Sequence, residues 1–312
     1  MKNNIKIDDS SKKILIIGAN GFLGNQLLQI GKNYKESTTD FEIIAADILN
    51  NYILPEIPFY FLDITKPQEV TKKILEISPE VIILTSAITN VDQNEIEKEL
   101  ASRINTEGPK HVLKACKKVN AKLVFMSTDF VFDGISKSGN YNENDEPNPL
   151  NHYGKTKYEA EKAILHSELD FLICRIAVLY GWNKDKLNFI TWILNKLEQQ
   201  EKISIVTNQI NNATFAPNLA EIILTLIEKN AHGIYHTAGD GALSRYEMAI
   251  KCAEVFNCDK NLITPIDYLK QKAIRPKNAG LDISKLKKLI QSELKIFKLI
   301  DGLKYMKKNR DE

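Results

Sequence analysis

Short apolar runs alternate with helical patterns along the first half of the chain. Residues 13–18 read KILIIG, an apolar run closed by glycine, which is typical of a parallel strand buried on both faces. After this run, apolar residues recur at the spacing of one helix face between Phe22 and Ile30. Strands and helices that alternate in this way predict βαβ units, and hence an α/β Rossmann fold with a doubly wound parallel sheet. The predicted strands are residues 13–18, 42–47, 59–63, 81–87, 122–128 and 171–180.

The alternation breaks down after Tyr180, where strands and helices become shorter and less regular. We expect a smaller C-terminal α/β substrate domain here rather than a second Rossmann unit. Residues 12–180 are assigned to the dinucleotide-binding domain, to which the chain returns near 210–238, and residues 181–209 and 239–312 to the substrate-binding part. The predicted elements are a helix near 186–200, a strand at 203–207, a helix from near Pro217 and a strand at 233–239.

Two helix starts carry the capping-box pattern, in which a hydroxyl residue is followed three residues later by Glu or Gln. Thr65 with Gln68 predicts one such start, where Pro67 reinforces the pattern. Ser244 with Glu247 predicts the other, at the head of the amphipathic segment SRYEMAIKCAEVF.

Charge and cysteine content exclude several classes of protein. The chain has 42 Lys and Arg against 40 Asp and Glu, and it contains no long basic block, so nucleic-acid binding is not expected. The cysteines lack C-x-x-C spacing and predict reduced structural thiols rather than a metal site. No stretch approaches the ~20 apolar residues of a membrane helix, and residues 1–13 lack the apolar core of a signal peptide. We therefore expect a cytoplasmic protein without membrane contact. The cysteines are Cys116, Cys174, Cys252 and Cys258.

The first motif with a chemical meaning is G-A-N-G-F-L-G at residues 18–24, between a predicted strand and a predicted helix. In a dinucleotide-binding loop the first glycine makes the tight turn, the second lets the backbone approach the pyrophosphate, and the third packs helix against strand. These positions are Gly18, Gly21 and Gly24. The following helix N-terminus offers free N–H groups to phosphate oxygens. The motif predicts dinucleotide binding, although its spacing differs from the standard G-x-G-x-x-G.

Two strand-end carboxylates follow the glycine motif. Asp47 ends the second predicted strand, where a carboxylate accepts hydrogen bonds from the adenine ribose and repels a 2′-phosphate. No Arg or Lys follows immediately, so NADH is mildly favoured over NADPH. Asp63 ends the third predicted strand and either reaches the adenine amino group or caps the loop before Thr65.

A second constellation is Tyr153-Gly-Lys-Thr-Lys157, in which Tyr153 and Lys157 lie four residues apart on one helix face. An ammonium close to a phenol favours the phenolate and lowers a pKa that starts near ~10. Such a pair exchanges a proton with a carbonyl or an alcohol. The fifth predicted strand ends in Ser127-Thr128, which puts a hydroxyl within reach of the same substrate oxygen.

Taken together, these features resemble the extended short-chain dehydrogenase/reductase superfamily. More narrowly, three segments resemble the dTDP-4-dehydrorhamnose reductase family, and the short segments VDQNE and RINTEG fit the same pattern. The resemblance extends from about Lys13 to Leu289. It implies NAD(P)H-dependent reduction of the 4-keto group of a nucleotide-activated deoxysugar. The three segments are STDFVFDG (127–134), NPLNHYGKTKYEAEKAI (148–164) and RPKNAGLD (275–282).

The resemblance also implies residue roles. Thr128 and Tyr153 bind the keto oxygen, Tyr153 supplies the proton, and Lys157 holds the nicotinamide ribose. Asn105 corresponds to the asparagine that anchors a water in the superfamily's proton relay. Pro109, four residues on, either kinks the helix and frees the Asn105 carbonyl or begins a new helix. Further cofactor-binding candidates are Asn20, Phe22, Leu23, Ile64, Ser86 and Ala87. Further substrate-binding candidates are Val131, Phe132 and Arg275. Arg275 either binds the pyrophosphate of the substrate or forms a surface salt bridge.

Val178 is a departure from this family, whose members usually carry a tryptophan at that position in the sugar pocket. Trp182 either packs in the core or fills the part of the sugar pocket that the family's tryptophan would occupy. The stretch around Val178 also resembles the regulatory β subunit of methionine adenosyltransferase, which binds the dinucleotide and serves as a partner of the catalytic subunit. That regulatory role, and a sugar-nucleotide epimerase, stay open as alternatives, as does a homodimer.

Overall fold

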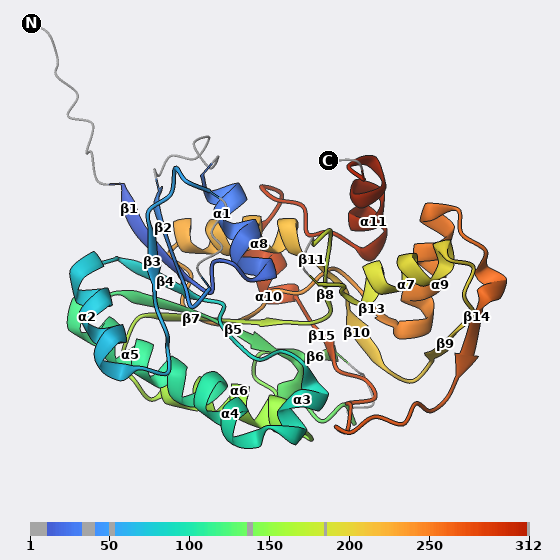
Figure 1. The fold of residues 1–312 in the computed structure, drawn as a ribbon, viewed down its shortest axis with the longest axis horizontal. Coiled ribbons are helices and arrows are strands. Elements are labelled where there is room, and N and C mark those ends of the chain that lie inside the picture. Colours follow the sequence, from blue (N-terminus) through green and yellow to red (C-terminus); the bar gives the residue numbers. More distant parts are fainter. Residues whose placement is uncertain (1–10, 33–40, 50–53, 136–139, 184–185, 311–312) are drawn as a thin grey trace, which may run out of the picture.

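The fold is built on a parallel β-sheet with helices on both faces (Figure 1). The computed structural model describes residues 11–32, 41–49, 54–135, 140–183 and 186–310. Its main sheet has the strand order β12-β7-β5-β4-β1-β2-β3, and every neighbouring pair is parallel. The chain leaves β1 in one direction and returns on its other side at β4, which creates the crevice in which such folds bind ligands. The strands are β1 (Lys12–Ile17), β2 (Phe41–Asp47), β3 (Phe59–Phe61), β4 (Val81–Leu84), β5 (Lys122–Thr128), β7 (Phe171–Ile176) and β12 (Gly233–His236).

Two hydrophobic cores lie on opposite faces of this sheet. Alternate residues of each strand enter one core or the other, as Ile14 and Leu15 of β1 do. Both faces of the sheet are therefore shielded from solvent, which explains why the central strands are apolar throughout and do not alternate between apolar and polar residues. One face is covered by α1 (Phe22–Gly31), α8 (Ala216–Glu228) and α10 (Ser284–Ile290), and the other by α2 (Pro67–Ile77), α5 (Gly108–Val119) and α6 (His152–Leu165).

A second lobe with its own hydrophobic core stands beside the carboxyl ends of the strands, on the right in Figure 1. Its elements are α7 (Phe189–Glu198), β9 (Ile203–Val206), α9 (Arg245–Phe256), β14 (Ile263–Ile266) and α11 (Leu299–Lys308). The remaining elements are shorter: α3 (Val91–Ile96), α4 (Lys98–Ser102), a π-helical turn (Arg103–Glu107), 3-10 turns (Asp129–Val131 and Lys260–Leu262), β6 (Asn140–Tyr141), β8 (Leu179–Tyr180), β10 (Ile210–Asn212), β11 (Thr214–Phe215), β13 (Ala242–Ser244) and β15 (Gly280–Leu281).

The predicted α/β fold with a doubly wound parallel sheet is confirmed, and β12 shows that the chain returns to this sheet within residues 210–238. The boundaries of the two domains stay a prediction. The predicted strand at 171–180 is divided in two, because Val178 between β7 and β8 has a φ of 38°. A β-branched residue rarely adopts this left-handed conformation, and it ends the regular strand.

Of the two predicted capping boxes, one forms. The Ser244 hydroxyl accepts from the Glu247 N–H, and the Glu247 carboxylate accepts from the Ser244 N–H. The prediction at Thr65 is wrong: α2 begins at Pro67, and the Thr65 hydroxyl and N–H both donate to Asp63 instead. A nearby carboxylate accepts both donors and so outcompetes the cap.

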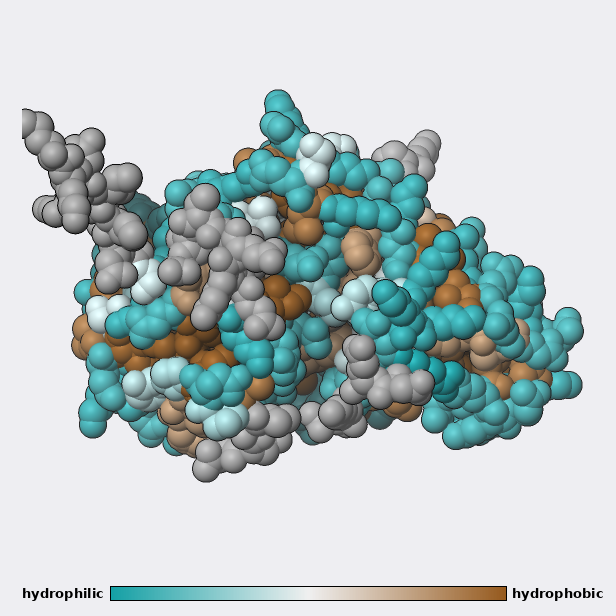
Figure 2. Space-filling model, turned by 90° about the horizontal axis from the view of Figure 1, so that it is seen from above, coloured by the Kyte–Doolittle hydropathy of each residue, from teal (hydrophilic) through white to brown (hydrophobic). Residues whose placement is uncertain are grey.

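The surface is mostly hydrophilic, and the hydrophobic residues on the face shown in Figure 2 lie in separate patches. Within the described residues, no helix has the length and apolar character needed to cross a membrane. The four cysteines are free thiols, as expected, and all but Cys258 are buried.

Candidate active site

The glycine loop between β1 and α1 has the geometry that a phosphate-binding turn requires. Gly18 has a φ of 92°, and a Cβ there would lie 2.5 Å from the Thr85 hydroxyl, so only glycine fits. A Cβ on Gly24 would lie 2.1 Å from the Gly18 carbonyl oxygen, so this glycine lets α1 pack onto the loop. At Gly21 the nearest atom to a Cβ is that same carbonyl, at 3.1 Å, and the remaining space is open. The three positions therefore match the turn, the helix contact and the open approach for a phosphate.

The start of α1 is free to bind an anion. Gly21 is its N-cap, no side chain caps its N–H groups, and its first turn has no acidic residue. The loop is held from behind by Asp47, whose carboxylate accepts from the N–H groups of Asn20 at 2.9 Å and Leu49 at 3.0 Å. Both Asp47 oxygens thus already have a backbone donor, and the residue fixes the loop whether or not a ribose binds it as well.

A single cavity of about 800 Å³ extends from the glycine loop into the second lobe. Most of the predicted cofactor loop and three of the four residues predicted to be catalytic share this cavity. The predicted site residues that line it are Asn20, Gly21, Phe22, Leu23, Gly24, Ala87, Thr128, Tyr153, Lys157 and Arg275. Those that do not line it are Gly18, Asp47, Asp63, Ile64, Ser86, Asn105, Val131 and Phe132.

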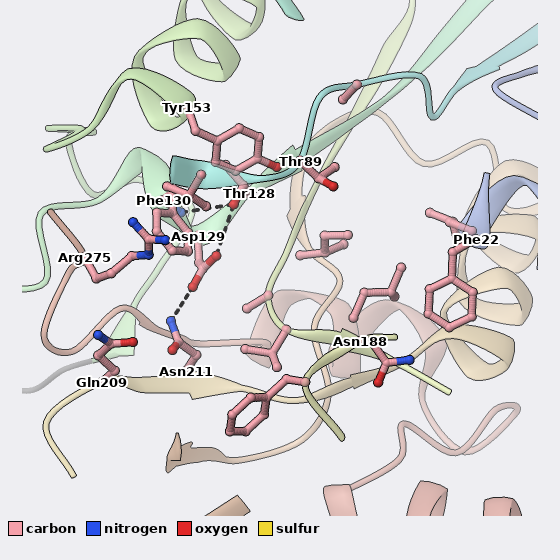
Figure 3. Close-up of a pocket in the computed structure, with 18 of the residues that line it drawn as sticks. Phe22, Thr89, Thr128, Asp129, Phe130, Tyr153, Asn188, Gln209, Asn211 and Arg275 are labelled. Atoms are coloured by element: carbon pink, nitrogen blue, oxygen red, sulfur yellow. Dashed lines mark hydrogen bonds between the residues drawn. The ribbon is translucent and has the colours of Figure 1, made fainter. Parts of the chain in front are cut away.

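Thr128 and Tyr153 meet at the end of β5 (Figure 3). The Asn151 side chain caps α6 by accepting from the Gly154 N–H, which sets where Tyr153 stands on the first turn. A Cβ on Gly154 would lie 2.1 Å from the Phe130 carbonyl oxygen, so this glycine lets α6 approach the turn that follows Thr128. The ring of Phe130 also packs edge-on against Tyr153, with centroids 5.9 Å apart.

Burial controls the protonation of the Tyr153–Lys157 pair. It raises the pKa of Tyr153, and the charge of Asp129 adds to this, while a hydrogen bond with Thr128 opposes it. Burial also lowers the pKa of Lys157 to about 7, against the attraction of Glu161. The Lys157 ammonium stands 4.1 Å from the centroid of the Phe125 ring. The predicted lowering of the Tyr153 pKa is therefore not found in this structure, because burial penalises the phenolate more than any nearby cation favours it. At neutral pH the phenol carries its proton.

Asn105 lies next to this site but not in it. Its side-chain amide donates to the Ile88 carbonyl and to the Asn94 side chain, and its oxygen accepts from the Ile88 N–H. The residue is buried in the π-helical turn Arg103–Glu107, and Pro109 follows at the start of α5. Its side chain thus holds the loop after β4, and its role in a proton relay stays a prediction.

The placement of Val131 and Phe132 corrects the expectation that they contact substrate. Both are completely buried in the hydrophobic core and lie behind the cavity wall. The Phe132 ring stacks on Tyr141, and the Arg175 guanidinium stands over it at 5.1 Å. The 3-10 turn Asp129–Val131 follows Thr128 directly, and both side chains pack into the core on one face of the sheet.

The remaining aromatic and carboxylate candidates are also placed by their contacts. Trp182 does not fill the pocket: its indole N–H donates to the Met306 carbonyl at 2.9 Å. The pocket tryptophan is Trp192 of α7, which lines the cavity together with Val178. Asp63 accepts from Thr65, so it has the loop-capping role that the sequence left open as an alternative.

Sequence reasoning missed a polar wall of the cavity, which is formed by Asp129 after β5 and by residues from later in the chain: Asn211, Arg245 and Arg275. Asp129 follows Thr128 and is buried beside it; its carboxylate accepts from the Thr128 hydroxyl and from the Asn211 amide (Figure 3). Burial raises the pKa of Asp129 to about 6, against the positive charge of Arg245 and these hydrogen bonds. Arg275 donates to Asp92 at 3.1 Å and to the Ala273 carbonyl at 2.9 Å, and it also lines the cavity. The adjacency of Asp129 to Thr128 was the one available signal in the sequence.

The fold and this cavity define a Rossmann-type dinucleotide-binding protein of the short-chain dehydrogenase/reductase kind, with a Tyr–Lys pair facing the cofactor loop. The model of the RmlD substrate binding domain matches residues 12–306, and the chain belongs to that family.

Similar proteins carry two different names. A dTDP-4-dehydrorhamnose reductase of Aggregatibacter actinomycetemcomitans is 32% identical over 88% of this chain and 92% of its own. The methionine adenosyltransferase 2 subunit beta of Xenopus tropicalis is also 32% identical, over 89% of this chain and 82% of its own. Among solved structures, dTDP-4-dehydrorhamnose reductase of Bacillus anthracis in complex with NADP is 31% identical, with a TM-score of 0.82 over 96% of this chain and all of that one. A UDP-glucose 4-epimerase of Thermus thermophilus, at 16% identity and a TM-score of 0.78, shares the fold alone.

Proposed function

We propose that this protein is an NAD(P)H-dependent reductase of the 4-keto group of a nucleotide-activated deoxysugar. The observation that carries the proposal is one cavity that is lined by the glycine loop, by Thr128, Tyr153 and Lys157, and by the polar wall described above. A relative and a solved structure named dTDP-4-dehydrorhamnose reductase, the latter with NADP, support it. The open approach at Gly21 and the uncapped start of α1 fit the pyrophosphate of a dinucleotide.

Three side chains have separate roles in the proposed reduction. When bound, the cofactor supplies a hydride to the carbonyl carbon. The Thr128 hydroxyl, which donates to Asp129 in this structure, turns to donate its hydrogen bond to the carbonyl oxygen and polarises it. Tyr153 gives its phenolic proton to the same oxygen as negative charge develops there, which completes the alcohol. The phenolate left behind is stabilised by the Lys157 ammonium across one turn of α6, until a proton from solvent restores it.

Replacing Tyr153 with phenylalanine tests this assignment, since it removes only the hydroxyl. We expect Tyr153→Phe to lower turnover of dTDP-4-dehydrorhamnose by at least about a hundredfold and to leave NADPH binding, followed by fluorescence, near normal. Tyr158→Phe is the matched control, because Tyr158 lies on the same helix outside the cavity. Undiminished turnover in Tyr153→Phe would remove the proposed mechanism.

A regulatory role is the second candidate, favoured by the equal identity to methionine adenosyltransferase 2 subunit beta. It requires stable binding to a methionine adenosyltransferase catalytic subunit, measured by co-purification and calorimetry with the purified protein. Tyr153→Phe should not change that binding. Binding without sugar-nucleotide turnover would replace the reductase proposal by the regulatory one. Self-association into a homodimer and a cytoplasmic location remain parts of the proposal, the first testable by light scattering.

The preference for NADH over NADPH also stays a prediction. Its basis is the Asp47 carboxylate at the end of β2, where a 2′-phosphate would meet negative charge. Residues 50–53, which follow this strand end, lie outside the described residues. Comparing KM for the two reduced cofactors is the direct test.

A further inference from the structure

Arg245 is a cavity-lining cation that the mechanism above does not use. It is the first residue of α9, and its N–H donates to the Gln209 carbonyl at 3.0 Å, which anchors the backbone in the second lobe. Its guanidinium stands 4.7 Å from the centroid of the Phe189 ring. A ring against one face of the guanidinium holds it in position and leaves its edge, with five N–H donors, for a ligand.

No described residue makes a hydrogen bond or an ion pair with the Arg245 guanidinium, although charged groups surround it. Burial lowers its pKa to about 10; the charge of Asp129 opposes this shift and that of Arg275 adds to it. Asp129 is engaged elsewhere, since its oxygens accept from Thr128 and Asn211. Arg275 is paired with Asp92. Arg245 is therefore a partly buried cation in the cavity wall that lacks a direct counter-ion among the described residues, a state that a bound anion would stabilise.

The position of Arg245 relative to Thr128 indicates which anion binds. Thr128, Asp129 and Arg245 line the same cavity, and the charge of Asp129, the chain neighbour of Thr128, acts on Arg245, so Arg245 faces the space next to the place where the keto oxygen is held. In a nucleotide sugar the phosphate is attached at C1, across the pyranose ring from C4. A sugar with its C4 carbonyl at Thr128 and Tyr153 thus carries its sugar-linked phosphate one ring away, on the side of the second lobe.

We propose that Arg245 binds the sugar-linked phosphate of a nucleoside diphosphate sugar and makes the protein select diphosphates over monophosphates. This subsite rests on the proposed function for its orientation. Arg275 lies near Asp129 in the same cavity (Figure 3), and its positive charge acts on Arg245. A guanidinium recognises phosphate oxygens through paired N–H donors, a geometry that lysine does not offer.

The test measures binding without turnover. Thymidine diphosphate and thymidine monophosphate are titrated calorimetrically into the full chain at saturating NADP⁺, which keeps both probes out of the cofactor site. We expect the diphosphate to bind the natural protein at least about tenfold more tightly, since a charge-assisted hydrogen bond is worth that factor or more. Arg245→Gln should abolish this preference by weakening the diphosphate alone. Arg310→Gln is the matched control, because Arg310 pairs with Glu198 outside the cavity.

Each outcome is informative about the subsite. Equal loss of both probes in Arg245→Gln, an unchanged preference, or binding of neither probe to the natural protein overturns it. The proposed function fails independently, when the natural protein shows the Arg245-dependent preference and yet does not reduce a 4-keto sugar nucleotide. Turnover by the natural protein together with an unchanged preference in Arg245→Gln removes the subsite and leaves the reductase standing.

Discussion

Glu161 and Arg175 form a buried ion pair beneath the active-site helix, and its disruption gives a prediction about both stability and pH dependence. Glu161 lies one turn after Lys157 on α6, and Arg175 lies on β7. The guanidinium donates through Nε at 3.1 Å and through Nη2 at 2.7 Å to the two carboxylate oxygens. Glu161 is 0% exposed and Arg175 is 2% exposed. Replacing Glu161 with glutamine keeps the shape of the side chain and removes its charge.

The expected magnitude follows from this burial. Removing one partner of a buried pair leaves an uncompensated charge and costs about 3–5 kcal/mol. Glutamine still offers one oxygen to Arg175, so we expect Glu161→Gln to lie near the lower limit, at about 3 kcal/mol. The Arg175 Nη1 group has no partner among the described residues, so no second acceptor takes over. A loss of this size lowers the Tm of a chain this long by roughly 4–5 °C.

The same substitution acts on the active site. The charge of Glu161 raises the pKa of Lys157, against the burial that lowers it to about 7. The reaction needs the ammonium form, so activity falls as the pH rises through that pKa. Without Glu161 the pKa of Lys157 decreases further, and the alkaline fall of kcat/KM should move to lower pH.

Urea unfolding at pH 7 and a pH profile of kcat/KM measure the two effects. Glu159→Gln is the control, since Glu159 is on the same helix and pairs with Lys162 on the surface, where such pairs contribute little. Glu161→Leu combined with Arg175→Met should recover most of the stability, because a buried pair can be replaced by apolar side chains. A loss below about 1 kcal/mol in Glu161→Gln, or an unmoved pH profile, would refute the reasoning.

Two further predictions concern the cofactor loop and the buried lysine. Gly24→Ala should weaken NADPH binding by more than about tenfold, because its Cβ would lie 2.1 Å from the Gly18 carbonyl oxygen. Gly31→Ala is the control and should bind NADPH normally in the same fluorescence titration, because its Cβ would meet only side-chain atoms, of Ile43 at 3.1 Å and of Leu224 at 4.0 Å. Lys157 has a folded pKa near 7, well below its unfolded value, so between about pH 7 and 10.5 the unfolded chain binds more protons and stability rises with pH. Lys157→Met should remove this rise and stabilise the fold more at pH 7 than at pH 10, as urea unfolding at the two pH values would show; equal effects at both would contradict it.

The parts predicted correctly from the sequence are those whose signal is local. The central strands are apolar throughout because both of their faces are covered, so their positions follow from a few consecutive residues such as Ile14 to Ile17. The glycine loop is equally local, because the clash that excludes a side chain at Gly24 comes from Gly18, six residues away. The Ser244–Glu247 capping box spans a single turn.

The parts that could not be predicted depend on contacts between distant segments. Asn211 reaches Asp129 across 82 residues of sequence, and Arg275 reaches Asp92 across 183. Neither β10 nor the segment around Arg275 has a pattern that specifies which part of the first lobe it will meet. Trp192 and Trp182 are ten residues apart, and only the packing of α7 decides that Trp192 faces the cavity.

The tripeptide Ser127-Thr128-Asp129 contains both a residue whose position follows from the local sequence and a residue whose contacts come from distant segments. Thr128 belongs to β5 and to the proposed chemistry, whereas Asp129 is held by Asn211 and influenced by Arg245 of the second lobe. A substitution in the second lobe can therefore change what the cavity accepts without moving Thr128, Tyr153 or the glycine loop.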